Sequence, residues 1–236
     1  MNLTSLWEEA SHYNDSFIQS PKFNYSAVKD RNWPNRLCFT EDIKQESLSF
    51  VKNTVLLDFP NLIIPYWDIY GTNSYQLLEQ NGFTKLFEQR GMSLEINKSY
   101  DLHSNVEIKL ISTKKDAILW SKLFTASFGY EIHPEILVNS HKNINYYIAY
   151  HQGKAIGTAI TYQTDNVTGI HSVGIIPEGR RKGLANDLMK LLLNIAVKNK
   201  SELVTLQASE IGKELYLKLG FEDQFLIKNY ILEPTK

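Results

Sequence analysis

The sequence contains a single cysteine, no long apolar run and almost no net charge. One cysteine, Cys38, excludes an intramolecular disulfide and a zinc site built from several cysteines. Its neighbours Leu37 and Phe39 favour a small buried side chain over a reactive nucleophile. No apolar stretch reaches the roughly 18 residues needed to cross a bilayer. The acidic pair Glu8 and Glu9 stands where a signal peptide would need an apolar core. We therefore expect a cytoplasmic protein with no membrane partner.

The charge balance narrows the function classes further. With 25 basic and 26 acidic residues, the net charge is -1. This balance offers no general electrostatic footprint for nucleic acid or for an anionic membrane, although a local basic patch remains compatible with it. At 236 residues and 43% hydrophobic composition, the chain can bury one large core or two small ones.

Hydrophobic periodicity predicts a mixed α/β chain in two parts. In the first part we expect helices over residues 3–14, 40–52 and 74–80, and extended segments over 36–39, 55–59 and 83–96. In the second part we expect strands over 106–111, 146–150, 155–162, 168–176, 203–207 and 224–232, and helices over 113–128, 183–199 and 210–219. The polar stretch 97–105 is the candidate linker, which gives an N-terminal domain of residues 1–102 and a second domain of residues 103–236.

A weak internal repeat relates the two parts. A shift of 138 residues places Gly82 over Gly220 and Phe83 over Phe221. Six identities fall between positions 77 and 95, where chance pairing gives about one. The repeat predicts that a helix, a Gly-Phe stop and a strand are used twice.

The segment from residue 173 to residue 185 is the most informative part of the chain. A strand ends near Ile176, and Pro177 turns the chain because proline cannot continue a central ladder. The basic run Arg-Arg-Lys at 180–182 then precedes Gly183, where the long helix begins. Backbone N–H groups, a helix N-terminus and three cations thus meet at one point, which predicts a phosphate or pyrophosphate site.

Other phosphate loops fit this segment less well. A P-loop needs Ser or Thr after its Gly-Lys pair, whereas Leu184 and Ala185 follow Lys182 and Gly183 here. A dinucleotide fingerprint needs three glycines at fixed spacing, and these are absent. A solvated, idle loop at a helix start is the alternative interpretation. The apolar strand before the loop and the apolar helix after it favour the anion site.

With these flanking elements, the chain resembles the GCN5-related N-acetyltransferase (GNAT) family, a coenzyme A-dependent superfamily. Residues 180–185, Arg-Arg-Lys-Gly-Leu-Ala, match its Arg/Gln-x-x-Gly-x-Gly/Ala signature, and residues 215–221 resemble its Leu-Tyr-x-x-x-Gly-Phe block. The resemblance covers about residues 106–232. It implies the α/β, mixed-sheet acyl-CoA N-acyltransferase fold, in two tandem halves with the second intact. Residues 1–102 lack the signature, so we expect a degenerate or accessory half there; an unrelated helical extension is the alternative.

The resemblance implies acetyl-CoA as cosubstrate and no metal. The backbone amides of the signature loop would bind the pyrophosphate, and the preceding strand would pair with the pantetheine arm. Ser209 stands where the family often has Asn, and it can still cap the following helix. The cofactor-binding residues expected on this basis are Val173, Ile175, Ile176, Arg180, Arg181, Lys182, Gly183, Leu184, Ala185 and Ser209.

The same resemblance implies direct attack of an amine, from a small molecule or a peptide, on the thioester. Tyr216 would be the general acid that protonates the departing thiolate, since a phenol near pKa 10 can donate to a thiol near 8.5. His171 is the first candidate for the general base. Glu131 and His133 are weaker candidates, and a water chain is a further route. The alternative readings are a core tyrosine and a structural histidine.

Three functions therefore stay open at this stage. The chain could be an acetyl-CoA-dependent N-acetyltransferase, a transferase for a longer acyl-CoA, or a non-catalytic acyl-CoA-binding or interaction protein. The acceptor and the choice between monomer and homodimer cannot be read from the sequence.

Overall fold

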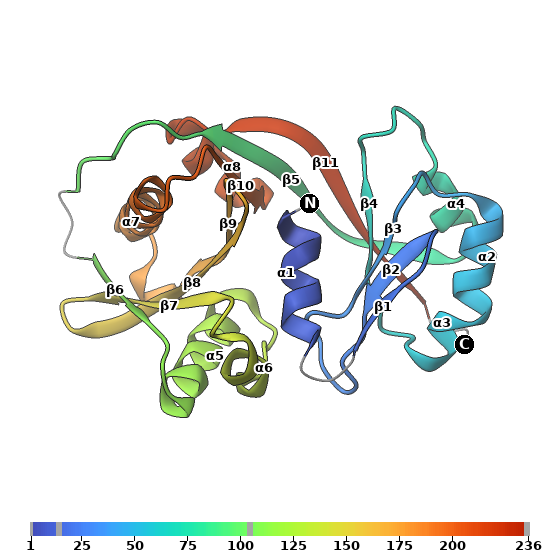
Figure 1. The fold of residues 1–236 in the computed structure, drawn as a ribbon, viewed down its shortest axis with the longest axis horizontal. Coiled ribbons are helices and arrows are strands. Elements are labelled where there is room, and N and C mark those ends of the chain that lie inside the picture. Colours follow the sequence, from blue (N-terminus) through green and yellow to red (C-terminus); the bar gives the residue numbers. More distant parts are fainter. Residues whose placement is uncertain (1, 13–15, 103–105, 234–236) are drawn as a thin grey trace.

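The computed structural model describes residues 2–12, 16–102 and 106–233. These residues form an N-terminal and a C-terminal half, bridged by two long strands, with a helix between the halves (Figure 1). One eight-stranded mixed sheet, in the order β4-β11-β5-β10-β9-β8-β7-β6, runs through both halves. A separate three-stranded sheet, β1-β2-β3, lies in the N-terminal half. Across the described ranges, every helix is too short or too polar to cross a membrane.

The N-terminal half is built from short elements. They are α1 (Asn2–Ser11), β1 (Phe17–Gln19), β2 (Phe23–Ser26), β3 (Arg36–Phe39), α2 (Gln45–Asn53), α3 (Val55–Asp58), β4 (Ile64–Trp67), α4 (Tyr75–Gln80) and β5 (Phe83–Glu95). The sequence predicted α1, β3, α4 and β5 but missed β1, β2 and β4, which span only three or four residues each. The strand predicted over 55–59 is wrong: it is helix α3, because so short an apolar run has no readable period.

Two further details of this half differ from the prediction. The second helix begins at Gln45 instead of residue 40, and its N-cap Lys44 makes no side-chain cap. Thr40, the predicted cap, instead donates its hydroxyl to the carbonyl of Pro21 at 2.8 Å. Strand β5 also continues through Gly91, where an interruption was expected.

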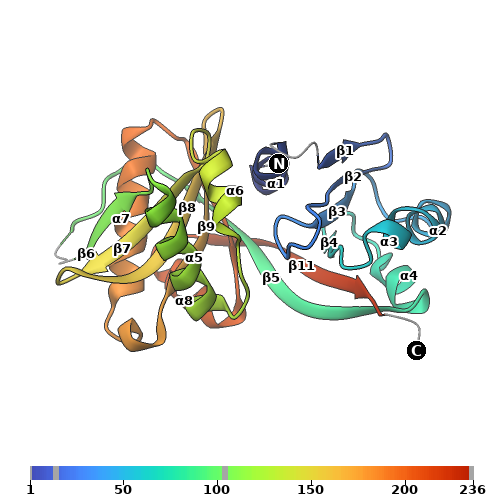
Figure 2. The same ribbon diagram turned by 90° about the horizontal axis from the view of Figure 1, so that it is seen from below.

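The C-terminal half follows the predicted order closely. It comprises β6 (Val106–Leu110), α5 (Lys114–Phe128), α6 (Pro134–Ser140), β7 (Asn145–His151), β8 (Lys154–Thr164), β9 (Val167–Ile175), the 3-10 turn η2 (Pro177–Gly179), α7 (Leu184–Lys198), β10 (Leu203–Ala208), α8 (Glu210–Lys218) and β11 (Glu222–Leu232). Helix α6 was not predicted. Figure 2 shows α7 on one side of the sheet and α5 and α6 on the other. Apolar side chains fill both interfaces.

The polar stretch after β5 is fixed to the C-terminal half. The backbone N–H of Tyr100 donates to Asn194 Oδ1 at 2.7 Å, and Asn194 Nδ2 donates back to the carbonyl of Tyr100 at 2.9 Å. Residues 103–105 of the candidate linker lie outside the described residues. The described part of this stretch is therefore docked on α7.

Both halves use the same order of elements. Each has a three-stranded meander, a helical segment, a strand that lies parallel to the meander's last strand, a short helix and a long final strand. The 138-residue shift carries β4, α4 and β5 onto β10, α8 and β11 to within a few residues. The glycines that end the two short helices, Gly82 and Gly220, both have positive φ, at 86° and 97°. The sequence repeat is thus a repeat of structure.

The two halves exchange their final strands. Strand β5 of the N-terminal half pairs with β10, and β11 of the C-terminal half pairs with β4. The exchanged strands also pair with each other, from Glu222 opposite Ser93 to Leu232 opposite Phe83. In Figure 1 they arch together from one half to the other.

Candidate active site

A V-shaped opening lies between β9 and β10 in the C-terminal half. The two strands pair only where they begin, with Val167–Gly169 opposite Leu203–Thr205. Further along they separate, so that the edge of β9 facing β10 has no strand partner among the described residues. An edge of this kind presents backbone N–H and C=O groups to an extended ligand.

A bulge deforms β9 beside this opening. Ser172 and Val173 together stand opposite the single residue Ala159 of β8. Ser172 has a positive φ of 53°, and its carbonyl accepts a hydrogen bond from Thr158 Oγ1 at 3.0 Å. Bulges re-aim backbone groups next to functional sites. This bulge was not predictable from the sequence, because Ser172 is not a residue type that marks positive φ.

The signature loop at the end of β9 exposes a set of backbone donors. Arg181 and Gly183 both have positive φ, at 60° and 77°, and α7 starts directly afterwards at Leu184. The backbone N–H groups of residues 181–185 donate to no other described residue. A side chain at Gly183 would stand in open space, with nothing within 4 Å. The loop therefore has both the donors and the room for a phosphate group.

The three cations of the loop have different roles. Arg180 ties the loop to its surroundings, donating from Nε to the carbonyl of Ile175 at 3.0 Å and from Nη2 to that of Ser127 at 3.1 Å. Lys182 Nζ donates to the carbonyl of Glu178 at 2.8 Å. Arg181 is exposed, and its side chain forms no hydrogen bond or ion pair with the described residues. Arg180 and Lys182 therefore shape the loop, and Arg181 is the cation available to a ligand.

Tyr216 lies on α8, the helix that follows β10. Its ring meets Phe221 edge-on, with centroids 5.9 Å apart. Its hydroxyl bonds to no described residue. Burial raises the pKa of Tyr216 to about 12, so the phenol keeps its proton at any physiological pH. At the start of the same helix, Ser209 acts as the predicted N-cap and accepts from the N–H of Gly212 at 3.3 Å.

His171 bridges the opening instead of facing it freely. Its Nδ1 lies 2.9 Å from Oε1 of Gln207 on β10, and its Nε2 lies 3.0 Å from Oδ1 of Asn2 on α1. The ring is buried, and burial lowers the pKa of His171 to about 4. A histidine in this state is neutral and has one N–H, so the ring donates a hydrogen bond to only one of these two amide oxygens. Sequence reasoning missed Asn2 and Gln207, since neither belongs to a local motif.

The remaining candidate side chains, Glu131, His133 and Cys38, have other surroundings. Glu131 is exposed and accepts from the hydroxyl of Ser121 at 3.3 Å. His133 caps α6, with its side chain accepting from the N–H of Glu135. Cys38 packs beside an apolar cluster in the N-terminal half, and burial raises the pKa of its thiol to about 12. The thiol is half-buried, where the sequence predicted a buried one, and at this pKa it is protonated and a poor nucleophile at neutral pH.

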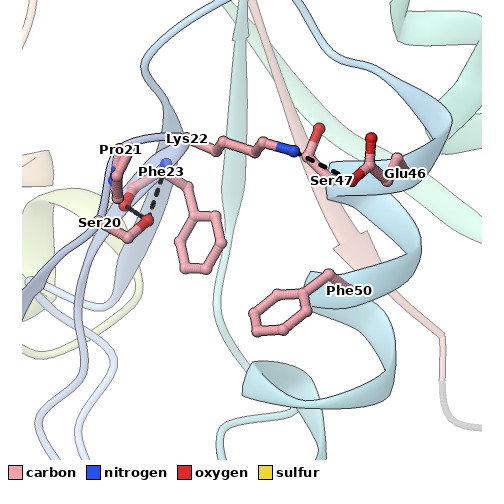
Figure 3. Close-up of a pocket in the computed structure, with 7 residues that line it drawn as sticks. All are labelled: Ser20, Pro21, Lys22, Phe23, Glu46, Ser47 and Phe50. Atoms are coloured by element: carbon pink, nitrogen blue, oxygen red, sulfur yellow. Dashed lines mark hydrogen bonds and ion pairs between the residues drawn. The ribbon is translucent and has the colours of Figure 1, made fainter.

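A shallow cavity in the N-terminal half is separate from this opening. It lies between the loop before β2 and helix α2, where the rings of Phe23 and Phe50 face each other and Lys22 pairs with Glu46 at 3.2 Å (Figure 3). None of its lining residues belongs to the signature loop or to α8.

The bulged, splayed strand pair and the donor-rich loop together define the acyl-CoA N-acyltransferase fold. Residues 116–221 match the family model described as "Acetyltransferase (GNAT) family". Residues 116–221 are therefore a GNAT-family domain, and that membership implies acyl transfer from an acyl-CoA. No curated protein sequence matches the chain.

Solved structures agree with this fold over nearly the whole chain. A GCN5-related N-acetyltransferase from Kribbella flavida superposes with a TM-score of 0.71 at 14% identity, covering 97% of this chain and 95% of its own. A conserved protein of unknown function from Staphylococcus epidermidis gives 0.65 at 13% identity, with 92% and 93% covered. A GCN5-related N-acetyltransferase from Sphaerobacter thermophilus gives 0.62 at 13%, with 91% and 78% covered. At such low identity these likenesses establish the fold alone.

Proposed function

We propose that the protein is an N-acetyltransferase that moves an acetyl group from acetyl-CoA to an amine, on a small molecule or a peptide. The observation that carries the proposal is the set of free backbone N–H groups at residues 181–185, placed where β9 ends and α7 begins. These donors would hold the coenzyme pyrophosphate, assisted by the positive end of the helix dipole. Arg181 would add the one cation that the loop leaves free.

The pantetheine arm would continue along the open edge of β9. Residues Val173, Ile175 and Ile176 lie on or just after this edge, and the bulge at Ser172 breaks the regular ladder where the acetyl group would sit. A backbone N–H turned toward the opening at this point would polarise the thioester carbonyl. Ile211, at the start of α8, is 97% exposed, and it could cover the apolar part of the arm.

Tyr216 would act on the leaving group. As the amine nitrogen bonds to the carbonyl carbon, the carbon–sulfur bond breaks and negative charge collects on sulfur. A phenol of pKa about 12 is a weaker acid than the free thiol near 8.5. Tyr216 therefore stabilises the thiolate mainly by donating a hydrogen bond, and full proton transfer is a secondary route.

The proton of the attacking amine needs an acceptor. His171 can serve only if it gives up its bond to Asn2 or to Gln207. A water chain to the surface, or an amine that arrives neutral, meets the same need without that cost.

We also propose that the N-terminal half, residues 1–102, is a GNAT-like half without the signature loop. The shared element order and the exchanged strands support this proposal.

The test measures acetyl-CoA binding by calorimetry and coenzyme A release across a panel of amines. Binding together with amine-dependent release is the expected result. Absence of acetyl-CoA binding would refute the proposal. Binding of acetyl-CoA without release of coenzyme A for any amine would favour a non-catalytic acyl-CoA-binding protein. Faster release from longer acyl-CoA donors would favour a transferase for a longer acyl chain.

A further inference from the structure

A second cavity, of about 350 Å³, lies in the N-terminal half. Helix α1 forms one wall, strands β2 and β3 another, and the segment after β4 a third. The cavity adjoins Cys38 and Trp67, beyond the point where β3 and β4 meet through the bridge between Arg36 and Ile63. It thus occupies the region where the two parallel strands of this half separate.

A buried cation lines this cavity and forms no ion pair with a described residue. The residue Arg36 is 8% exposed, and its Nε is buried with no hydrogen-bond partner. Its Nη1 donates to the carbonyl of Asn35 at 2.8 Å, and its guanidinium lies 5.6 Å from the centroid of Trp7. Among the described residues, no carboxylate forms an ion pair with Arg36, although Arg31, Arg90 and several lysines do have such partners.

An unpaired buried charge is costly for the folded state. Removal of a guanidinium from water destabilises the folded state unless an anion and further hydrogen bonds offset the lost hydration. Burial lowers the pKa of Arg36, and the side chains that oppose this shift are those of Tyr130 and Cys38. Neither is an anion at neutral pH. The missing anion can therefore come from a ligand.

The rest of the lining indicates what the anion is attached to. Aromatic rings surround the cavity, and Ile69 and Tyr70 on its rim are 54% and 39% exposed. Glu8 also lines it, so a ligand with two negative charges would meet one cation and one anion. The aromatic side chains are Trp7, Phe17, Tyr25, Phe39, Trp67 and Tyr70.

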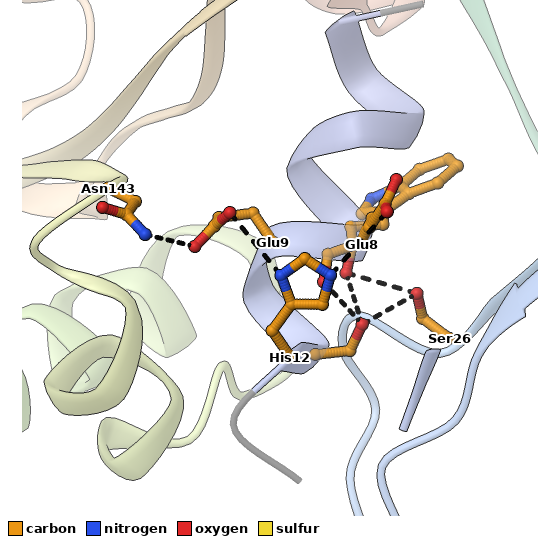
Figure 4. A network of polar contacts seen from close by, with 7 residues as sticks. Glu8, Glu9, His12, Ser26 and Asn143 are labelled. Atoms are coloured by element: carbon orange, nitrogen blue, oxygen red, sulfur yellow. Dashed lines mark hydrogen bonds and ion pairs between the residues drawn. The ribbon is translucent and has the colours of Figure 1, made fainter. Parts of the chain in front are cut away.

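Helix α1, which forms one wall of the cavity, is hydrogen-bonded to both halves of the protein. Ser11 Oγ donates to Ser26 Oγ on β2 at 3.1 Å, and Asn143 Nδ2 of the C-terminal half donates to Glu9 Oε1 at 2.6 Å (Figure 4). His12 lies 3.7 Å from Glu8 and from Glu9. Glu8 therefore faces a histidine on its own helix, while Arg36 belongs to the opposite wall.

We propose that this cavity is a binding site for a small organic monocarboxylate with an apolar, preferably aromatic, body. The carboxylate pairs with the guanidinium of Arg36, and the body packs against the aromatic wall that Trp7 and Trp67 form, with ring centroids 6.3 Å apart. A cavity lined by one guanidinium and by the carboxylate of Glu8 matches one negative charge better than the two of a phosphate. The site is separate from the proposed acetyl-CoA site and does not depend on it.

The test compares carboxylates with their neutral amides on the full chain. Thermal unfolding is followed with benzoate, phenylacetate and indole-3-acetate, with the three matching amides, and with inorganic phosphate. At least one carboxylate should raise the Tm, while its amide and phosphate should not. Arg36→Met should remove this rise and also raise the Tm of the ligand-free protein. Arg31→Met, which alters a surface arginine, is the matched control and should keep the rise.

A second variant leaves the core intact. Ile69→Glu adds a negative charge at the exposed rim and should reduce the carboxylate-induced Tm rise. The proposal is wrong if no carboxylate protects the wild-type protein, or if the amides or phosphate protect it equally. It is also wrong if folded Arg36→Met keeps the full effect or, where that variant does not fold, if Ile69→Glu keeps it. None of these readouts involves acetyl-CoA, so failure of the enzyme proposal would not affect them.

Discussion

The side chain of Asn2 lies 3.0 Å from the ring of His171, although 169 positions separate the two residues in the chain. Asn2 also donates to the carbonyl of Tyr162 at 2.9 Å and to Thr164 Oγ1 at 3.1 Å. Gly169 makes room for it, because a Cβ at that position would stand 1.8 Å from Asn2 Oδ1. The first turn of α1 is therefore seated against the strand that precedes the signature loop.

The burial of His171 beneath α1 predicts that the free energy of unfolding depends on pH. The pKa of His171 falls from 6.5 to about 4 on folding, so the unfolded chain binds a proton that the folded protein excludes. The stability contributed by neutral His171 is complete above pH 6.5 and is lost as the pH falls toward 4. We expect a loss on the order of 2–3 kcal/mol over this window. Urea unfolding of wild-type protein and His171→Gln measures it, and an equal loss in both would contradict the assignment.

Gly183→Ala should weaken coenzyme A binding about tenfold or more, which is about 1.4 kcal/mol. The new methyl group enters the open space in front of the loop donors, and the positive φ adds strain of about 1–2 kcal/mol. Gly153→Ala is the matched control, because Gly153 also has a positive φ, 73°, and open space around it. Calorimetry should find equal affinity in the control. Unchanged affinity in Gly183→Ala would remove the loop from coenzyme binding.

Tyr216→Phe should lower kcat by about 100-fold, within the usual range for loss of a positioned proton donor. The KM for acetyl-CoA should change far less, since the phenol acts on charge that develops only in the transition state. Tyr100→Phe is the control: its hydroxyl donates to the carbonyl of Leu219 at 3.0 Å, and its loss should cost about 1 kcal/mol of stability without a change in kcat. Equal rates for Tyr216→Phe and wild type would exclude the catalytic role.

Asp116→Asn should destabilise the C-terminal half. Asp116 completes a capping box with Thr113 and lies 3.0 Å from Lys109 Nζ, and chiefly the bond from Lys109 lowers its pKa from 3.8 to about 2. The stabilisation of the folded state by ionised Asp116 is present above its unfolded pKa near 3.8 and is lost as the pH falls through about 2. We expect a loss of about 1–2 kcal/mol at neutral pH. Chemical denaturation at neutral and strongly acidic pH checks this, because the two proteins should converge in acid.

Gly91→Ala tests the packing of the exchanged strands. A Cβ on Gly91 would stand 2.6 Å from the ring of Phe225, which itself packs edge-on against Trp67. Overpacking of this kind costs about 1–3 kcal/mol. A double variant with Phe225→Leu should lose less stability than the two single losses added together. Simple additivity in a double-mutant cycle would show that the two positions do not couple.

The sequence predicted the C-terminal half better than the N-terminal half for a physical reason. Helix α7 and strands β7 to β9 are long enough for their hydrophobic period to be read, and the loop at residues 180–185 has a local signature. Strands β1, β2 and β4 are too short to show a period, and β4 is apolar at every position. Their structure comes from partners that are distant in the chain.

The site was predicted in the same uneven way. Gly183 and Ser209 take the places expected of them at the two helix starts. The environment of His171 was not predictable, because its two partners come from α1 and β10 and no local pattern connects them. The buried position of Arg36 was hidden for the same reason, since a single arginine in a four-residue strand reads as a surface residue.

The exchange of β5 and β11 has a practical consequence for any shortened form of this protein. A fragment starting at residue 106 would keep the signature loop and Tyr216 but lose the strand that lies between β10 and β11. Both strands would then present bare backbone edges, which invite self-association. We therefore expect the C-terminal half to aggregate when it is produced without β5, and to stay monodisperse only as part of the intact chain.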